Sequence, residues 1–217
     1  MPESKTATET GTIVVSGTGR VAVEPDIADL RLGVAVSRPT VDAARNEAAR
    51  LMDAILAAVD GAGVARKDVR TALLSVQPRY DYRESRAPAL TGYELANLVE
   101  VTVRDLKKLG DVVDGTLAAG ATSMDGLSFR VADPAAAEAE ARRRAMAEAR
   151  ARADVLAEAA GLAIEGVADI VEGGPGRPPI PYPKAERMAL AAADVSTPVE
   201  SGSLEVAVTV TVTYRAR

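Results

Sequence analysis

The segment from Leu204 to Arg215, "LEVAVTVTVTYR", alternates apolar and polar residues almost without exception. Leu204, four valines and Tyr214 fall on one side of an extended chain, and Glu205, Ala207, three threonines and Arg215 fall on the other. A period of two is typical of a β-strand that packs against a core on one face and is wet or paired on the other. The chain must therefore supply further strands and a layer that covers one face of a sheet.

Other segments with strand character occur at residues 12–23, 28–36, 69–82, 93–103, 127–131 and 164–171. Two long helices are predicted, one from the N-cap Thr40 to about Val59 and one from Asp133 and Pro134 to about Ala160, with a shorter helix over 106–119. We predict an α+β fold with a mainly antiparallel sheet or sheets and the two long helices packed on one face. The polar stretch 83–92 predicts a long β-hairpin whose tip projects.

The longest helix is rich in alanine and arginine. Its predicted buried stripe is Ala139, Met146, Ala149, Ala153, Leu156 and Ala160. The run of Arg142, Arg143 and Arg144 has acidic residues on either side and is interpreted as a solvated, internally paired face in preference to an anion site. Arg142 also falls on the apolar stripe and is therefore a candidate for contact with a partner chain. After residue 171, the Pro-rich loop at about 173–198 is expected to be irregular and partly polyproline II, and residues 1–11 are expected to be a disordered tail.

The stretch "SGTGRVAVEPD" contains Gly17-x-Gly19-x-x-Ala22, which formally satisfies a dinucleotide-binding fingerprint. That fingerprint binds phosphate only where a helix follows the glycines directly. Here Val21 and Val23 alternate as in a strand and Pro25 follows. The glycines are better interpreted as a bulge or a close backbone contact in a strand.

The sequence contains neither cysteine nor histidine, which excludes disulfides, thiol chemistry, Cys or His metal sites and His-dependent nucleophiles. A net charge of −5 argues against a nucleic-acid partner. No run approaches the ~18 apolar residues of a membrane span. We expect no enzyme activity and no cofactor. The leading residues carry no signal-peptide pattern, which predicts a cytoplasmic protein, or an exported one if a leader was removed.

Three further features have both structural and functional interpretations. Asp26 and Asp29 are interpreted as turn and strand residues in preference to a catalytic pair. Tyr80 and Tyr82 share one strand and are interpreted as cross-strand packing in preference to a binding surface. Asn97 interrupts an apolar face and is expected to be a buried amide with a structural hydrogen bond in preference to a ligand contact.

Six segments of the chain follow one another as "VSGTGRVAVEPDIADLRLGV", "VRTALLSVQPRYDY", "GYELANLVEVTVRDLKKLGDVVD", "GLSFRVAD", the Ala/Arg/Glu helix and "TPVESGSLEVAVTVTVTYR". Together they resemble the SIMPL-domain family over residues 12–215. The resemblance implies no established catalytic residues. It implies that bacterial members are usually exported, one assembling into channel-like stacked rings and another linked to oxidative-stress defence, and that an animal namesake is a signalling adaptor. The matching positions that it marks as fold-defining are Gly17, Gly19, Pro25, Asp26, Tyr80, Gly92, Tyr93 and Asn97.

We therefore predict a non-enzymatic, self-assembling protein that forms a homo-oligomeric ring, channel-like or cage-like assembly, with a stress-related role. The candidate subunit-contact residues are Arg142, Pro178, Pro181, Tyr182 and Tyr214. The alternative is an adaptor that recruits another protein through the Pro-rich loop or the hairpin tip.

Overall fold

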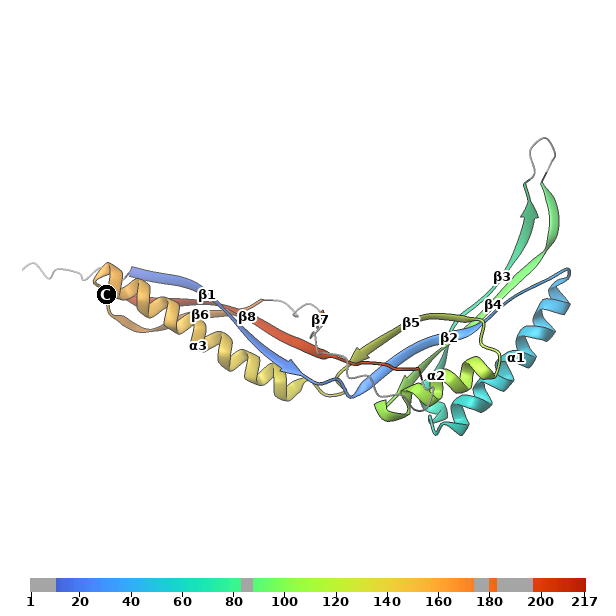
Figure 1. Ribbon diagram of the computed structural model, residues 1–217. Helices are drawn as coiled ribbons and strands as arrows, with labels where there is room; N and C mark the ends of the chain where they lie inside the picture. Colours follow the sequence, from blue (N-terminus) through green and yellow to red (C-terminus); the bar gives the residue numbers. More distant parts are fainter. Residues whose placement is uncertain (1–10, 83–87, 174–179, 183–196) are drawn as a thin grey trace, which may run out of the picture. The chain divides into compact units, whose positions relative to one another are not determined.

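A computed structural model describes residues 11–82, 88–173, 180–182 and 197–217. This part of the chain forms two compact units, the first holding β1, α3, β6, β7 and β8 and the second holding β2, α1, β3, β4, α2 and β5 (Figure 1). The strands are β1 Gly11–Val23, β2 Ile27–Arg38, β3 Val69–Asp81, β4 Ala89–Val103, β5 Ser123–Arg130, β6 Ile164–Glu172, β7 Ile180–Tyr182 and β8 Ser203–Ala216. The α-helices are α1 Val41–Gly61, α2 Leu109–Ala118 and α3 Ala135–Ala160.

The first unit is built around β8, the strand with the strict alternation. An antiparallel sheet has the order β1-β8-β6, and β7 pairs with the opposite end of β8. The side chains of Leu204, Val210, Val212 and Tyr214 are buried, whereas hydroxyls on the other face join Thr209 to Thr18 and Thr211 to Ser16 at 3.0 Å each. The prediction of one packed face and one polar face is confirmed.

Helix α3 covers the packed face of this sheet, lying along β1 and β8 (Figure 1). Its buried residues are Ala141, Ala145, Ala149, Ala153 and Ala157. The predicted stripe was correct at Ala149 and Ala153, and Met146 is half-buried against the same core. It was wrong at Leu156, which is 50% exposed, and at Ala160, which is exposed. Close approach to the strand selects the smallest side chains, so hydrophobicity alone indicated the wrong face. Gly161 ends the helix in the left-handed conformation, with φ 68°, as predicted.

The second unit is a sheet with the order β3-β4-β2-β5, and α1 and α2 pack on one of its faces (Figure 1). Its core joins strand residues such as Leu30 and Val101 to Ile55 of α1 and Val112 of α2. Helix α1 begins as predicted, because the Thr40 hydroxyl accepts a hydrogen bond from the Ala43 N–H at 3.3 Å.

The α+β class with antiparallel sheets is confirmed, and each long helix covers a sheet of its own. β3 and β4 pair antiparallel, but residues 83–87 lie outside the described part, so the projecting hairpin stays a prediction. The expectation of a wholly irregular Pro-rich loop was wrong at β7, whose three residues pair with β8. Proline is tolerated at a sheet edge, where no donor is required. Gly11 already belongs to β1, and residues 1–10 lie outside the description.

Candidate functional site

Gly17 and Gly19 lie where β1 contacts α3. A Cβ atom at Gly17 would lie 2.5 Å from the backbone nitrogen of Ala149, and one at Gly19 would lie 2.6 Å from that of Ala145. Both distances are below the closest approach of real side chains, so only glycine fits. The predicted close contact is confirmed. No bulge is present there, since the pairing with β8 is continuous. β1 runs on to Val23 as a strand, so the helix that a phosphate site needs does not follow.

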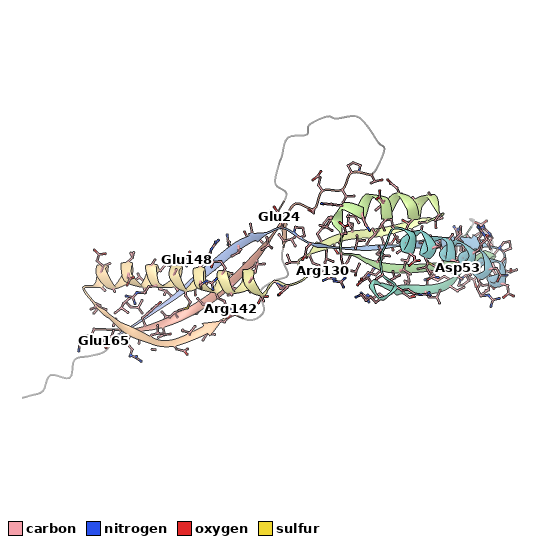
Figure 2. The ribbon with its side chains drawn as sticks, turned by 90° about the horizontal axis from the view of Figure 1, so that it is seen from below. Glu24, Asp53, Arg130, Arg142, Glu148 and Glu165 are labelled. Carbon is pink, nitrogen blue, oxygen red and sulfur yellow. The ribbon has the colours of Figure 1, made fainter. Side chains whose placement is uncertain are left out.

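The outer edge of β1 is covered by polar side chains of α3. Arg144 donates to the Arg20 carbonyl at 2.8 Å, Arg152 donates to the Ser16 carbonyl at 2.6 Å, and the Thr18 N–H donates to the Glu148 carboxylate. Figure 2 labels Glu148 on α3. Four helical residues rise about 6 Å and two strand residues about 6.6 Å. Every fourth residue of α3 can therefore reach every second residue of β1. Side chains of α3 thus occupy backbone groups with which another strand would pair.

The outer strands β3 and β6 lack such cover in the part of the chain that the structure describes. Leu74 and Val76 of β3 are 66% and 44% exposed, and Val167 and Ile170 of β6 are 40% and 50% exposed. We call these two pairs the β3 strip and the β6 strip. Each strip lies on the helix-covered side of its sheet, because its residues stand opposite Asn97 and Leu95 in β4, and opposite Tyr214 and Val212 in β8. The helices stop short of these strands, which leaves apolar surface uncovered.

A hollow of about 410 Å³ lies between α1 and β3. Its apolar wall includes Leu56, Ala57, Val69 and Val99, and its charged residues are Asp53, Asp60, Arg66 and Arg70. Figure 2 labels Asp53 in this unit. The hollow borders β3, so the uncovered surface on this side of the sheet is larger than the β3 strip itself.

Asp26 and Asp29 have separate structural roles. The Asp26 carboxylate accepts from the Ala132 N–H at 2.7 Å. Asp29 accepts from Thr102 and from Arg130 at 2.6 Å each, and Figure 2 labels Arg130. Partial burial opposes ionisation of Asp29, but these hydrogen bonds outweigh it and hold its pKa below the usual range. The two carboxylates therefore do not form the paired arrangement that acid–base catalysis uses.

The remaining fold-defining candidates occupy β3, β4 and the turn before β2. Pro25 is a buried residue that follows β1 and precedes β2 in the sequence. Gly92 has φ 151°, and a Cβ there would lie 2.7 Å from the Arg38 carbonyl oxygen. Tyr80 is 46% exposed, with its ring 6.3 Å from that of Tyr82. Tyr93 is half-buried.

Asn97 does not have the surroundings that its sequence position predicted. It is half-buried and makes no side-chain hydrogen bond within the described ranges. It stands on the inner strand β4, between the exposed Leu74 of the outer strand β3 and the buried Val34 of β2. The sequence pattern therefore located an interruption in the apolar face, but the interruption lies beside exposed surface and not inside the core.

The predicted subunit-contact residues have different environments. Arg142 is exposed and pairs with Glu172 at 3.0 Å and Glu138 at 3.4 Å, and its hydrogen bonds hold the pKa of Glu172 below the usual range. Tyr214 is 2% exposed in the core, so a second chain cannot reach it. The backbone of Pro181 and Tyr182 pairs with β8, and Pro178 lies outside the described residues.

Sequence reasoning missed both strips and the polar cover of β1. The alternation of apolar and polar residues around Leu74 and Val76 is the same in a covered and in an uncovered strand, so it does not predict that these side chains are exposed. A repeat of polar residues every four positions, at Arg144, Glu148 and Arg152, directly precedes three of the buried alanines. That repeat was the available signal for the cover.

Metal sites and membrane-spanning helices are the last two features to consider. Among the residues with a described position, no group of three or more acidic side chains could hold a metal ion. No helix in that part of the chain is long and apolar enough to cross a membrane.

These features define an α+β protein of two sheet-and-helix units in which the outer strand β1 is covered by α3, whereas the outer strands β3, β5 and β6 expose apolar side chains, in β5 those of Met124 and Leu127. Residues 13–214 match SIMPL, described as a protein of unknown function (DUF541), and the chain belongs to this family. The predicted resemblance is confirmed.

Two relatives illustrate the family. The chain is 32% identical to the 26 kDa periplasmic immunogenic protein of Brucella melitensis, over 99% of this chain and 88% of that protein. It is 37% identical to the uncharacterized protein YggE of Escherichia coli K12, over 62% of this chain and 54% of that protein. The prediction of a cytoplasmic protein is wrong, since the Brucella relative, matched over almost the whole chain, is periplasmic by name.

Proposed function

We propose that this chain is a non-enzymatic protein of the periplasm that assembles with copies of itself into a closed homo-oligomer. The observation that carries the proposal is the pair of uncovered apolar strips on β3 and β6. Single exposed apolar residues are ordinary on protein surfaces. Here they stand on outer strands, where unpaired backbone groups are also available, and such surfaces favour association.

The contrast with β1 strengthens this proposal. The same chain that leaves β3 and β6 open uses Arg144, Glu148 and Arg152 to cover the outer edge of β1. Proteins protect exposed edges against unwanted pairing. Protection of one edge only is what we expect of a protein that pairs through the others.

The periplasmic part of the proposal is supported by the Brucella relative, whose name gives that compartment. The non-enzymatic part is supported by the absence of cysteine and histidine from the sequence and by the structural engagement of Asp26 and Asp29. A surface that binds another copy of the chain does not require the thiol or imidazole groups that cysteine and histidine would supply.

Size-exclusion chromatography with light scattering tests the proposal. At micromolar concentration we expect a discrete species whose mass is a multiple of 22.5 kDa. The double substitution Leu74→Lys with Val76→Lys should lower that mass, because it places charge on the β3 strip. Leu117→Lys is the matched control, since Leu117 is 48% exposed on α2 of the same unit. A monomeric wild-type protein would overturn the proposal, and an unchanged mass for the double variant would remove the β3 strip from it.

A further inference from the structure

We infer that the hollow between α1 and β3 is a binding site for a basic amino acid such as lysine. A molecule of this class has an α-amino and an α-carboxylate group at one end, an apolar chain, and a second ammonium group at the other end. The inference follows from the shape of the hollow, from its apolar wall, and from charged side chains that have no partner in the described part of the chain.

The hollow is elongated along the C-terminal half of α1. Asp53, Ala57 and Asp60 line it from the helix, and residues at this spacing lie on one helix face. Seven helical residues rise about 10.5 Å, so the two aspartates stand at the ends of a wall that is about two turns long. The volume of about 410 Å³ lies within the range of roughly 300–1,000 Å³ that small-molecule sites have.

The apolar wall of the hollow belongs largely to the core of the second unit. Val59, Val64 and Val99 are buried side chains of that core. Leu56 of α1 and Val69 of β3 are half-buried and also line the hollow. A short hydrocarbon chain that lies against this wall removes apolar surface from water, which is favourable.

Two acids and one base of the hollow have no partner. The side chains of Asp53, Asp60 and Arg66 are exposed, and they make no ion pair or hydrogen bond with any described residue. Arg70 is already engaged, because its guanidinium donates to the Glu100 carboxylate at 2.6 Å. The hollow therefore offers a ligand two negative charges and one positive charge.

The positions of these charges indicate which ligand groups they bind. Asp53 stands at one end of the α1 wall, and Asp60 stands at the other end, where Arg66 follows the C-terminus of the helix. An ammonium group pairs with an aspartate, and a guanidinium pairs with a carboxylate. An α-amino carboxylate group carries both charges and therefore suits Asp60 and Arg66. The second ammonium of the ligand suits Asp53, and the methylene groups between them lie against the apolar wall.

Other classes of ligand fit this hollow less well. A simple anion would meet two free acids and only one free base. A purely apolar molecule would leave all three charges without a partner. A metal ion would need a group of three or more acidic side chains, and the described residues contain no such group. A ligand of net charge +1 compensates the net charge of the three free groups, which favours its binding.

Isothermal titration calorimetry with three probes tests the inference. L-Lysine carries all the proposed groups, L-norleucine lacks the side-chain ammonium, and cadaverine lacks the carboxylate. Each probe is titrated at millimolar concentration into the full chain in a buffer without amines. We expect lysine to bind with a Kd about threefold or more below that of either other probe, because each of them loses one exposed charge pair.

Two substitutions assign the ends of the ligand. Asp53→Asn should abolish the preference for lysine over norleucine, and Arg66→Gln should abolish the preference for lysine over cadaverine. Asp111→Asn is the matched control, since Asp111 is an exposed acid on α2 of the same unit and does not line the hollow. It should leave all three dissociation constants unchanged. All three positions are exposed, so folding should be preserved and is checked by circular dichroism.

Several results would overturn the inference. They are the absence of measurable lysine binding, equal affinity for the three probes, and a preference that survives the substitution assigned to it. An equal loss of affinity in Asp111→Asn would also overturn it, because that pattern is typical of general charge attraction. None of these results bears on self-assembly, which the mass of the wild-type protein tests separately.

Discussion

Gly19→Ala adds one methyl group at the contact between β1 and α3. Its Cβ would lie 2.6 Å from the Ala145 backbone nitrogen and closer still to the Ala141 carbonyl oxygen, whereas ordinary contact begins at 3.4 Å, so the helix must retreat by at least about 0.8 Å. The obstructing atoms are backbone, which no change of rotamer can move. Overpacking of this kind costs roughly 1–3 kcal/mol.

The retreat would also lengthen the hydrogen bonds that cover β1. Arg144 reaches the Arg20 carbonyl at 2.8 Å, and loss of such a bond costs about 0.5–1.5 kcal/mol at an exposed site. We therefore expect Gly19→Ala to lower the free energy of unfolding by about 1.5–4.5 kcal/mol in total. Gly126→Ala in β5 is the matched control, because a Cβ there meets nothing within 4 Å, and its effect should stay within about 1 kcal/mol.

Urea unfolding followed by far-ultraviolet circular dichroism measures both variants. All samples must have one protein concentration, since self-assembly contributes to apparent stability. The loss should occur in the transition of the unit that contains α3, if the two units unfold separately. A Gly19→Ala variant as stable as Gly126→Ala would refute the reasoning that close packing against α3 requires glycine.

Three further predictions concern the cover of β1, acid stability and the start of α1. Arg144→Ala should cost about 1 kcal/mol and speed aggregation on heating, measured by light scattering, whereas Arg143→Ala, which removes only a pair with Glu140, should change neither. The pKa of Asp29 is lower in the folded chain than in the unfolded one, so its stabilisation is present above pH ~4 and lost as pH falls through the folded pKa. When the urea midpoint is plotted against pH, the decrease at acid pH should therefore be smaller for Asp29→Asn than for wild type. Thr40→Ala should cost about 1 kcal/mol in thermal or urea unfolding, and Thr40→Ser should restore most of it.

Each of these predictions has an outcome that contradicts it. Equal aggregation rates for Arg144→Ala and Arg143→Ala would mean that the hydrogen bond to Arg20 does not protect β1. Parallel pH profiles for wild type and Asp29→Asn would show that Asp29 has the same pKa in the folded and unfolded chain. A Thr40→Ser variant as unstable as Thr40→Ala would assign the loss to something other than the hydroxyl.

The elements of the fold were largely predictable because their signals are local. Thr40 satisfies the first amides of α1, and Gly161 ends α3, through contacts with residues near in sequence. The failure at α3 shows the limit of such signals. Val155 and Leu156 are hydrophobic residues of that helix but are 65% and 50% exposed. Alanines at intervals of four are buried instead, because Gly17 and Gly19 bring a strand backbone too close for larger side chains.

The candidate site was much less predictable. Tyr214 and Leu74 both stand on apolar sides of alternating strands, but Tyr214 is in the core and Leu74 is 66% exposed. Which one is covered depends on how far a helix from elsewhere in the chain reaches across the sheet. The compartment was also missed, because the leading residues alone do not determine it.

The sequence by itself determined that this chain forms helices and half-buried strands of the α+β class, that Gly17 and Gly19 do not begin a nucleotide site, and that the chain belongs with the SIMPL proteins. Only the tertiary structure decided that β1 pairs with β8, that α3 covers the edge of β1, and that β3 and β6 stay open. The physical reason is one of range: periodicity and capping act between neighbours in sequence, whereas strand partners and the cover of an edge are set by residues more than a hundred positions apart, such as Ser16 and Arg152 with a separation of 136.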